Sequence, residues 1–232
     1  MIYVTADIHG MIDKFTQLLD TIDIEDPETT LFVLGDSIDY GPSGVQVLME
    51  MARHDNIIPL MGNHEFVTAK TLTRLMKELT DDRLSAITEV MMQDLMSWFK
   101  IGGEPTLREF YSLTMDARYD LIGYLCKFIP YTHVGLNGQD YILVHAGLGG
   151  FDEKRALKDY MMHELLFDDT DYQKPYYPDR YVITGHVPTR NIPGAVPDKI
   201  YKSGGHIAID CGAAIGGKLG CLCLNTMEEF YF

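Results

Sequence analysis

Three short apolar segments alternate with two helical patterns at the start of the chain. The three segments have the length of buried strands: IYVTA (2–6), TLFVL (30–34) and NIIPLM (56–61). Between the first two, MIDKFTQLLDTI (11–22) repeats its apolar residues at helical spacing, and Pro42 with Ser43 opens a second helical pattern. This alternation is typical of a parallel sheet with crossover helices, so we expect an α/β fold.

The remainder of the chain predicts a helical segment followed by a second sheet. Residues 64–128 are expected to be largely helical. After Tyr131 the pattern changes to short apolar runs separated by Gly, Asn and Pro: YILVH, YVITGH, KIYK, HIAID and LGCLCL. These runs predict a second, more antiparallel sheet. Because no linker separates the two halves, we expect residues 1–232 to form one domain.

A polar cluster follows each of five predicted strands. The clusters are DIHG (7–10), GDSIDYG (35–41), GNHE (62–65), HAGL (145–148) and GHVPT (185–189). In open α/β sheets, ligands bind outside the carboxyl ends of the strands. The five clusters are therefore expected to meet in one cleft.

The residue types in these clusters suit divalent metal ions. Imidazole, carboxylate and amide ligands together favour Mn, Fe or Zn and admit Mg. Asp7 and His9 are two residues apart, so extended backbone places them on the same side. One carboxylate can also bridge two ions. Taken alone, His145 or His186 would be a hydrogen-bonded structural histidine and an Asp-Gly pair a simple turn, but five such clusters together predict a metal centre.

The charge balance limits the partners. The chain has 34 acidic against 19 basic residues, a net charge of −15. This balance argues against nucleic acid and against an anionic membrane surface as partners. An anionic phosphate substrate would need bound cations to overcome the negative field.

The cysteines and the chain start favour a cytoplasmic location. The N-terminus lacks the pattern of a signal peptide, and no apolar run reaches the ~18–20 residues that span a bilayer. The four cysteines contain no CxxC pair, so a zinc site made from them is not expected. Reduced thiols are typical of the cytoplasm.

The ordered motifs resemble those of the calcineurin-like metallophosphoesterases. The set is Asp-x-His, Gly-Asp-x-x-Asp-x-Gly, Gly-Asn-His-Glu, His-Ala-Gly and Gly-His, ending in IAIDCGAAIGGKLGCLCL. Its spacing is similar to that of the bacterial phosphoprotein (serine/threonine) phosphatases, a branch that includes diadenosine tetraphosphate hydrolases. The resemblance covers Ile2 to about Leu224. It implies a four-layer αββα sandwich and two divalent metal ions, with Mn²⁺ expected first and Fe, Zn or Mg possible.

The resemblance also implies a role for each motif residue. Six positions would hold the two ions: Asp7, His9, Asp36, Asn63, His145 and His186, with Asp36 bridging. A hydroxide bridging the metals would attack phosphorus. His64, held by Asp39, would protonate the leaving oxygen, and Asn63 with Tyr40 would contact the substrate.

Two positions depart from the family pattern. Tyr40 stands where the family usually has arginine, and Asp169, in LLFDDTDY, stands at a second arginine position. Arginine binds phosphate with two parallel hydrogen bonds, which neither tyrosine nor aspartate can reproduce. Tyr40 could still donate one hydrogen bond. Arg155, Arg180 or Arg190 could replace the missing charge, although each has the sequence context of a surface residue.

Three functions are compatible with these observations. The first, which the resemblance favours, is a serine/threonine protein phosphatase acting on phosphorylated proteins or small phosphoesters. The second is a dinucleoside polyphosphate hydrolase or phosphodiesterase. The third is a catalytically weak metal-binding module that recognises a partner. The sequence predicts no oligomeric state.

Overall fold

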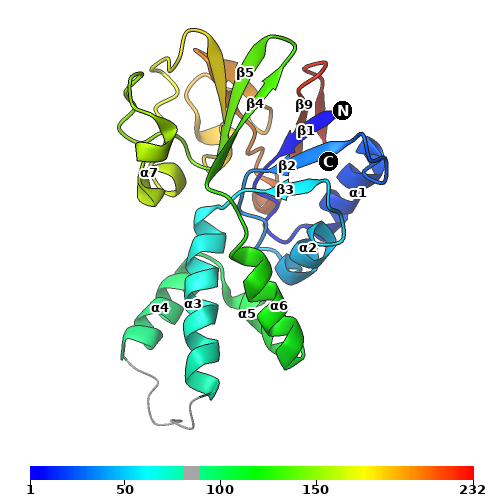
Figure 1. Cartoon of the computed structure of the whole chain (residues 1–232), viewed down its shortest axis with the longest axis vertical. Coiled ribbons are helices and arrows are strands. Elements are labelled where there is room, and N and C mark those ends of the chain that lie inside the picture. The colour runs from blue at the N-terminus through cyan, green and yellow to red at the C-terminus, as the bar shows by residue number, and fades with distance from the viewer. Residues whose placement is uncertain (81–88) are drawn as a thin grey trace.

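The computed structural model describes residues 1–80 and 89–232, which build two five-stranded sheets packed face to face (Figure 1). The first sheet has the order β10-β9-β1-β2-β3. Its strands are β1 (Ile2–Thr5), β2 (Thr30–Val33), β3 (Ile57–Pro59), β9 (Gly220–Cys223) and β10 (Glu229–Tyr231). The pairs β1–β2 and β2–β3 are parallel, as the strand–helix alternation predicts.

The second sheet is mixed and not mainly antiparallel. Its order is β4-β5-β6-β8-β7. The strands are β4 (Tyr131–Leu136), β5 (Gln139–Val144), β6 (Arg180–Thr184), β7 (Tyr201–Ser203) and β8 (His206–Ala208). The pairs β5–β6 and β6–β8 are parallel, whereas the outer pairs β4–β5 and β7–β8 are antiparallel. The expectation that LGCLCL joins this sheet is wrong, because β9 pairs with β1 of the first sheet.

Helices cover the outer faces of both sheets, which gives the four-layer αββα arrangement. Between the sheets lies an apolar core to which Val4, Leu34, Leu143 and Leu222 contribute. Helices α1 (Ile12–Ile22) and α2 (Gly44–Met51) cover the first sheet, and the short α7 (Met162–Leu166) covers the second.

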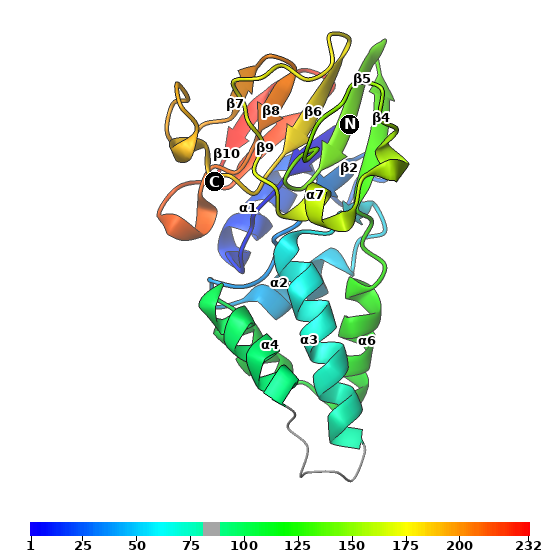
Figure 2. The same cartoon turned by 90° about the vertical axis from the view of Figure 1, so that its left-hand side faces the viewer.

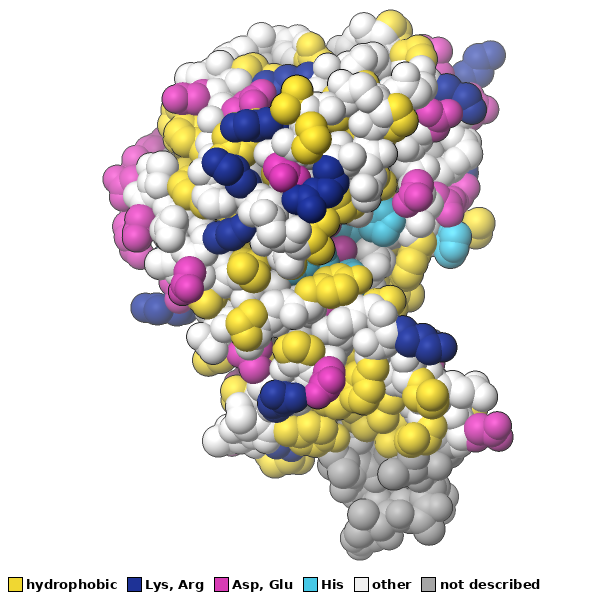
Figure 3. All heavy atoms as spheres, turned by 180° about the vertical axis from the view of Figure 1, so that it is seen from behind, with side chains coloured by type: hydrophobic (Ala, Val, Ile, Leu, Met, Phe, Trp, Pro, Cys, Tyr) yellow, Lys and Arg dark blue, Asp and Glu magenta, His cyan; other side chains and the backbone are white. Residues whose placement is uncertain are grey.

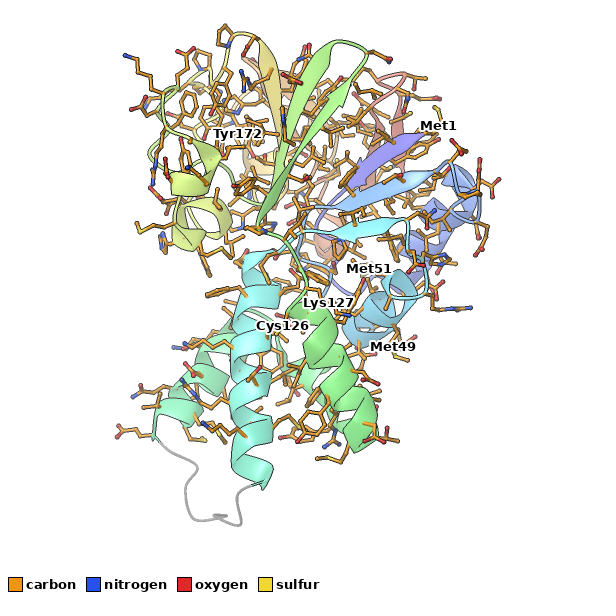
Figure 4. The ribbon with its side chains drawn as sticks, viewed as in Figure 1. Met1, Met49, Met51, Cys126, Lys127 and Tyr172 are labelled. Carbon is orange, nitrogen blue, oxygen red and sulfur yellow. The ribbon has the colours of Figure 1, made fainter. Side chains whose placement is uncertain are left out.

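The helices are amphipathic, so their orientation follows from their sequences. In α1 the buried residues are Phe15, Leu18, Leu19 and Ile22. In α2, Met51 is buried in the core, whereas Met49 points outward and is 51% exposed (Figure 4). Burial of these apolar faces, at ~25 cal/mol per Å², holds the helices against the sheet.

A helical lobe projects from the end of the first sheet, as Figure 2 shows. It consists of α3 (Asn63–Thr80), α4 (Glu89–Lys100), α5 (Glu104–Ser112) and α6 (Met115–Leu125). These helices agree with the range 64–128 expected to be helical, except that α3 begins one residue earlier. Residues 81–88 of that range are outside the described part. Trp98 and Phe110 are buried in the lobe.

In the described ranges 1–80 and 89–232, none of the helices has the length and apolar character needed to span a bilayer. Cys211, Cys221 and Cys223 are buried free thiols, and Cys126 is an exposed one.

Candidate metal centre

The five polar clusters meet at the carboxyl ends of their strands, beside the helical lobe. Residues from four of them, all but HAGL, line a cavity of about 300 Å³. Its polar side includes His9, Asp36, Asn63, His64 and His186. Figure 3 looks into this hollow, where histidine side chains lie between the sheets and the lobe.

Backbone carbonyls fix the orientation of two imidazole rings. Nδ1 of His9 lies 2.8 Å from the carbonyl oxygen of Ile38, and Nδ1 of His145 lies 2.7 Å from that of Leu34. A carbonyl oxygen can only accept, so Nδ1 carries the proton in both rings. In both rings Nε2 faces Asp36 Oδ2, at 3.9 Å for His9 and 3.4 Å for His145.

The atoms that face one another at the centre are mostly acceptors. Nε2 of His145 lies 2.8 Å from Oδ1 of Asn63, and Nδ1 of His186 lies 3.0 Å from the same oxygen. With its proton on Nδ1, a neutral His145 ring cannot donate to Asn63 or Asp36. A proton on Nε2 or a metal ion between these atoms would make the contacts favourable. The donor set fits divalent metal ions because it combines imidazole, carboxylate and amide oxygen.

Asp36 is shared by two candidate ion-binding groups. One group is His9, Asp36 and His64, and the other is Asp36, His145 and His186; in each, the ligand atoms lie within 4.8 Å of one another. Asp7 lies beside them, and its two carboxylate oxygens accept the backbone N–H of His186 at 2.9 and 3.0 Å. One carboxylate between two sets of ligands is an arrangement that can bridge two ions.

Five carboxylates are buried at the site, and none of the lysines and arginines in the described ranges forms an ion pair with them. They are Asp7, Asp36, Asp39, Glu65 and Asp210, each at most 4% exposed. Burial and the charges of Asp210 and Asp36 raise the pKa of Asp7 well above its usual range. Burial and the charge of Asp36 also raise the pKa of Glu65 to about 7. Metal cations would relieve this accumulation of negative charge.

Glu65 fastens the loop that carries Asp36. Its carboxylate accepts the backbone N–H groups of Asp36 at 2.8 Å, Ser37 at 2.6 Å and Gly62 at 3.1 Å. Any side chain at Gly62 would collide, because a Cβ there would lie 2.2 Å from Asp36 Oδ1. The sequence places Glu65 in the third polar cluster but gives no hint of this bracing role.

His64 and Asp39 form a buried dyad. Nδ1 of His64 lies 2.8 Å from Asp39 Oδ2, and its Nε2 lies 3.8 Å from Asp36 Oδ2. Burial alone would lower the pKa of His64, but the Asp36 and Asp39 carboxylates raise it to about 9. Two residues of the helical lobe also bind Asp39: Trp98 Nε1 donates at 2.9 Å and Thr106 Oγ1 at 2.7 Å. Neither contact is predicted by the sequence.

The site backbone is held in an unusual conformation. Ten non-glycine residues in the described ranges have positive φ, and six of them are at this site. The six are Asp7, His9, Asp36, Asp39, Tyr40 and His186, with φ between 47° and 67°. Such conformations cost on the order of 1–3 kcal/mol each and cluster at functional sites.

Tyr40 and Asp169, which stand at the two arginine positions of the family, both lie at the candidate site. The Tyr40 ring is about half exposed at the cavity, 4.9 Å from the His9 ring and 5.3 Å from the His64 ring. Asp169 faces His186, with 3.4 Å between Oδ1 and Nε2, so it can orient that ring. Neither residue places a cation at the cavity.

The three alternative arginines are engaged elsewhere. Arg155 binds Glu164, Arg180 binds Asp179, and Arg190 binds Asp198. Among the described residues that line the cavity there is no arginine or lysine. Arg190 Nη1 also donates to the carbonyl oxygen of Ile215 at 3.1 Å, behind the cavity wall.

A family model described as calcineurin-like phosphoesterase matches residues 1–210. The chain belongs to this family. Membership confirms the family resemblance seen in the motifs and indicates a metal-dependent phosphoester hydrolase. It does not decide between the branches of the family.

Several curated relatives carry the same name, symmetrical bis(5'-nucleosyl)-tetraphosphatase. The protein from Paracidovorax citrulli is 31% identical over 110 residues, covering 47% of this chain and 39% of that protein. The one from Chromobacterium violaceum is 37% identical over 148 residues, covering 63% of this chain and 43% of that protein. The matched part thus spans about two fifths of the length of these relatives.

Solved structures share the fold at lower identity. A chain described as a diadenosine tetraphosphatase candidate has a TM-score of 0.68 at 18% identity, covering 100% of this chain and 92% of that one. A serine/threonine phosphatase from Saccharomyces cerevisiae has a TM-score of 0.61 at 15% identity, covering 100% and 79%. At these identities the similarity concerns the fold alone.

Proposed function

We propose that this chain hydrolyses dinucleoside polyphosphates, of the bis(5'-nucleosyl)-tetraphosphate type, at a centre of two divalent metal ions. The observation that carries the proposal is the convergence of two ion-binding groups on the shared carboxylate of Asp36, beside the His64–Asp39 dyad. The relatives named as tetraphosphatases supply the substrate class. The cavity next to the candidate ligands could accommodate part of such a substrate.

The cavity wall suits a nucleoside better than a phosphorylated protein side chain. Besides the candidate ligands, the cavity is lined by Tyr40, Ile101, Ala213 and Ile215. Tyr40 is 52% exposed and Ile215 49% exposed, so both have free apolar surface. A nucleobase stacks well on such an aromatic face.

The absence of arginine among the described residues of the lining also favours this substrate class over a phosphomonoester. A terminal phosphate on a protein carries two charges on one group, which two arginines bind well. In a polyphosphate chain the charge is spread over several groups, and two divalent ions can neutralise much of it. The serine/threonine phosphatase function, which the motifs first favoured, is therefore the weaker candidate.

The roles of the side chains follow from their contacts. Asp7, His9, Asp36, Asn63, His145 and His186 would hold the two ions. When bound, the ions would lower the pKa of a water molecule and neutralise phosphoryl oxygens. His64 would hold a proton on Nε2 for the leaving phosphate oxygen while Asp39 keeps the ring oriented through Nδ1. Tyr40 would contact the substrate. Mn²⁺ remains the metal we expect first.

The test compares substrates in metal-stripped protein after Mn²⁺ is added back. We expect turnover of diadenosine tetraphosphate to exceed that of a phosphoserine peptide and of p-nitrophenyl phosphate. Chromatography of the products identifies the bond that breaks: two ADP molecules for symmetrical cleavage, ATP and AMP for asymmetrical cleavage. Preference for the phosphopeptide would replace the proposal with the protein phosphatase. Bound Mn²⁺ without turnover of any substrate would favour the metal-binding module.

A further inference from the structure

The indole N–H of Trp98 and the hydroxyl of Thr106 both point at the carboxylate of Asp39. Trp98 Nε1 lies 2.9 Å from Asp39 Oδ2, the oxygen that also binds His64. Thr106 Oγ1 lies 2.7 Å from Asp39 Oδ1 and accepts the Asp39 backbone N–H at 3.0 Å. Together with His64, both oxygens of this buried carboxylate are bound.

These two donors come from different elements than the dyad. Asp39 follows β2 and His64 lies in the first turn of α3, whereas Trp98 is near the end of α4 and Thr106 is in α5. Both are fully buried. The indole N–H of Trp98 and the hydroxyl of Thr106 form no hydrogen bond with the side chain of a candidate metal ligand. Their polar groups therefore serve Asp39.

The turn between α4 and α5 is built tightly around Trp98. A Cβ at Gly103 would lie 2.2 Å from the indole nitrogen, so only glycine leaves room for the ring. Gly102 has φ of +89° and its carbonyl oxygen accepts the backbone N–H of Tyr40 at 2.9 Å. The same turn contributes Ile101 to the cavity. The indole position, the Asp39 loop and the cavity wall are thus fixed by one turn.

We propose that Trp98 and Thr106 are positioning residues that set the reactivity of His64 through Asp39. A carboxylate with free oxygens can rotate and can exchange its partners. Held on three sides, Asp39 keeps one orientation, and it keeps the His64 ring with Nε2 toward the cavity. This inference rests on the proposed role of His64 as the proton donor to the leaving oxygen.

Thr106 offers a nearly isosteric test. Thr106→Val removes the hydroxyl and keeps the shape, and Thr106→Ser restores the hydroxyl. The substrates are the p-nitrophenyl and phenyl esters of thymidine 5'-phosphate, with Mn²⁺ bound. Because p-nitrophenolate leaves with little help from an acid, the loss in kcat should fall mainly on the phenyl ester. We expect the ratio of kcat for the p-nitrophenyl ester to kcat for the phenyl ester to rise on the order of tenfold in Thr106→Val. This is less than the 10²–10⁴ that a general acid contributes in full.

Trp98→Phe should raise the same ratio, with KM and bound metal close to wild type. Phe110→Leu is the matched control, because Phe110 is another buried aromatic residue of the lobe and its hydrocarbon ring cannot donate to Asp39. It should lower stability without raising the ratio. An equal loss on both esters in Thr106→Val and Trp98→Phe would mean that the contacts are only structural.

His64→Asn separates this inference from the proposed function. If it leaves the ratio unchanged, His64 is not the proton donor and the proposed mechanism fails. If it raises the ratio while both lobe variants do not, only the positioning role is wrong.

Trp98 is the only tryptophan in the chain, which gives a measurement that needs no turnover. Its indole N–H produces a single ¹H–¹⁵N signal, expected downfield and slow to exchange because it donates to a buried carboxylate. Asp39→Asn should move the signal upfield, since the acceptor loses its charge. An unmoved signal would overturn the proposed contact.

Discussion

Replacing Asp210 with asparagine should stabilise the metal-stripped protein at alkaline pH. Asp210 is 4% exposed, and burial together with the charge of Asp36 raises its pKa from 3.8 to about 6, although the N–H of Gly212 donates to it. A raised carboxyl pKa means that ionisation disfavours the folded state. The difference between 3.8 and about 6 corresponds to about 3 kcal/mol.

The sign of the pH dependence follows from proton counting. Between the two pKa values the folded protein binds more protons than the unfolded chain, so stability falls as the pH rises. The cost is about 1 kcal/mol at pH 4.5 and about 3 kcal/mol at pH 8. Asparagine cannot ionise but still offers an oxygen to Gly212. The stability difference between Asp210→Asn and wild type should therefore widen by about 2 kcal/mol between these pH values.

Thermal unfolding of the metal-stripped proteins measures this difference. At ~2–4 °C per kcal/mol for a chain of this length, the gap in Tm should widen by about 4–8 °C. Asp55→Asn, which removes one charge from an exposed turn, is the control and should show no such widening. With Mn²⁺ bound the gap should shrink, because the cations offset the buried charge. A gap that stays constant with pH would refute the argument that the Asp210 carboxylate is strained by its surroundings.

Three further predictions concern the metal ligands. Asp36→Asn should lose both ions and activity together, because both candidate groups share this carboxylate; metal content by mass spectrometry and Mn²⁺-dependent turnover measure this, and retention of both ions would contradict it. Gly185→Ala should lower stability by ~1–3 kcal/mol, and weaken Mn²⁺ binding, because its Cβ would lie 2.0 Å from Asp7 Oδ2; calorimetry tests both effects. Removing the metals with a chelator should lower the Tm of the wild type, since a ligand at 100 times its Kd stabilises by ~2.7 kcal/mol per site; an unchanged Tm would argue against ion binding at this centre.

Local patterns predict three of the five strands of the first sheet, β1, β2 and β3, because their pairing is local in sequence. β1, β2 and β3 are consecutive and are joined by helices, so the alternation alone specifies their order. The prediction for the strand Gly220–Cys223 is wrong, because its partner β1 lies more than 200 residues earlier in the chain. Nothing in GCLC indicates which of the two sheets the strand joins.

The difference between local and long-range contacts also explains which parts of the site were predictable. Metal-ligand types at strand ends identified the positions that the structure brings together. The partners of Asp39 were not visible, because Trp98 and Thr106 are 59 and 67 residues away from it and follow a helical pattern that suits an apolar core. A buried indole N–H needs an acceptor, but the sequence does not say which one.

The acidic composition and the anionic substrate class are compatible once the charges are located. Five buried carboxylates lie at the candidate centre, and the described residues lining the cavity include no lysine or arginine. Such a site repels phosphate until cations occupy it, so substrate binding should depend on metal more strongly than in a site that also carries arginines. The backbone with positive φ and the buried carboxylates lower the stability of the metal-free protein. The raised pKa values of Asp7, Glu65 and Asp210 reflect this unfavourable burial of negative charge. Metal binding would offset this loss of stability, so folding of the centre is coupled to metal binding.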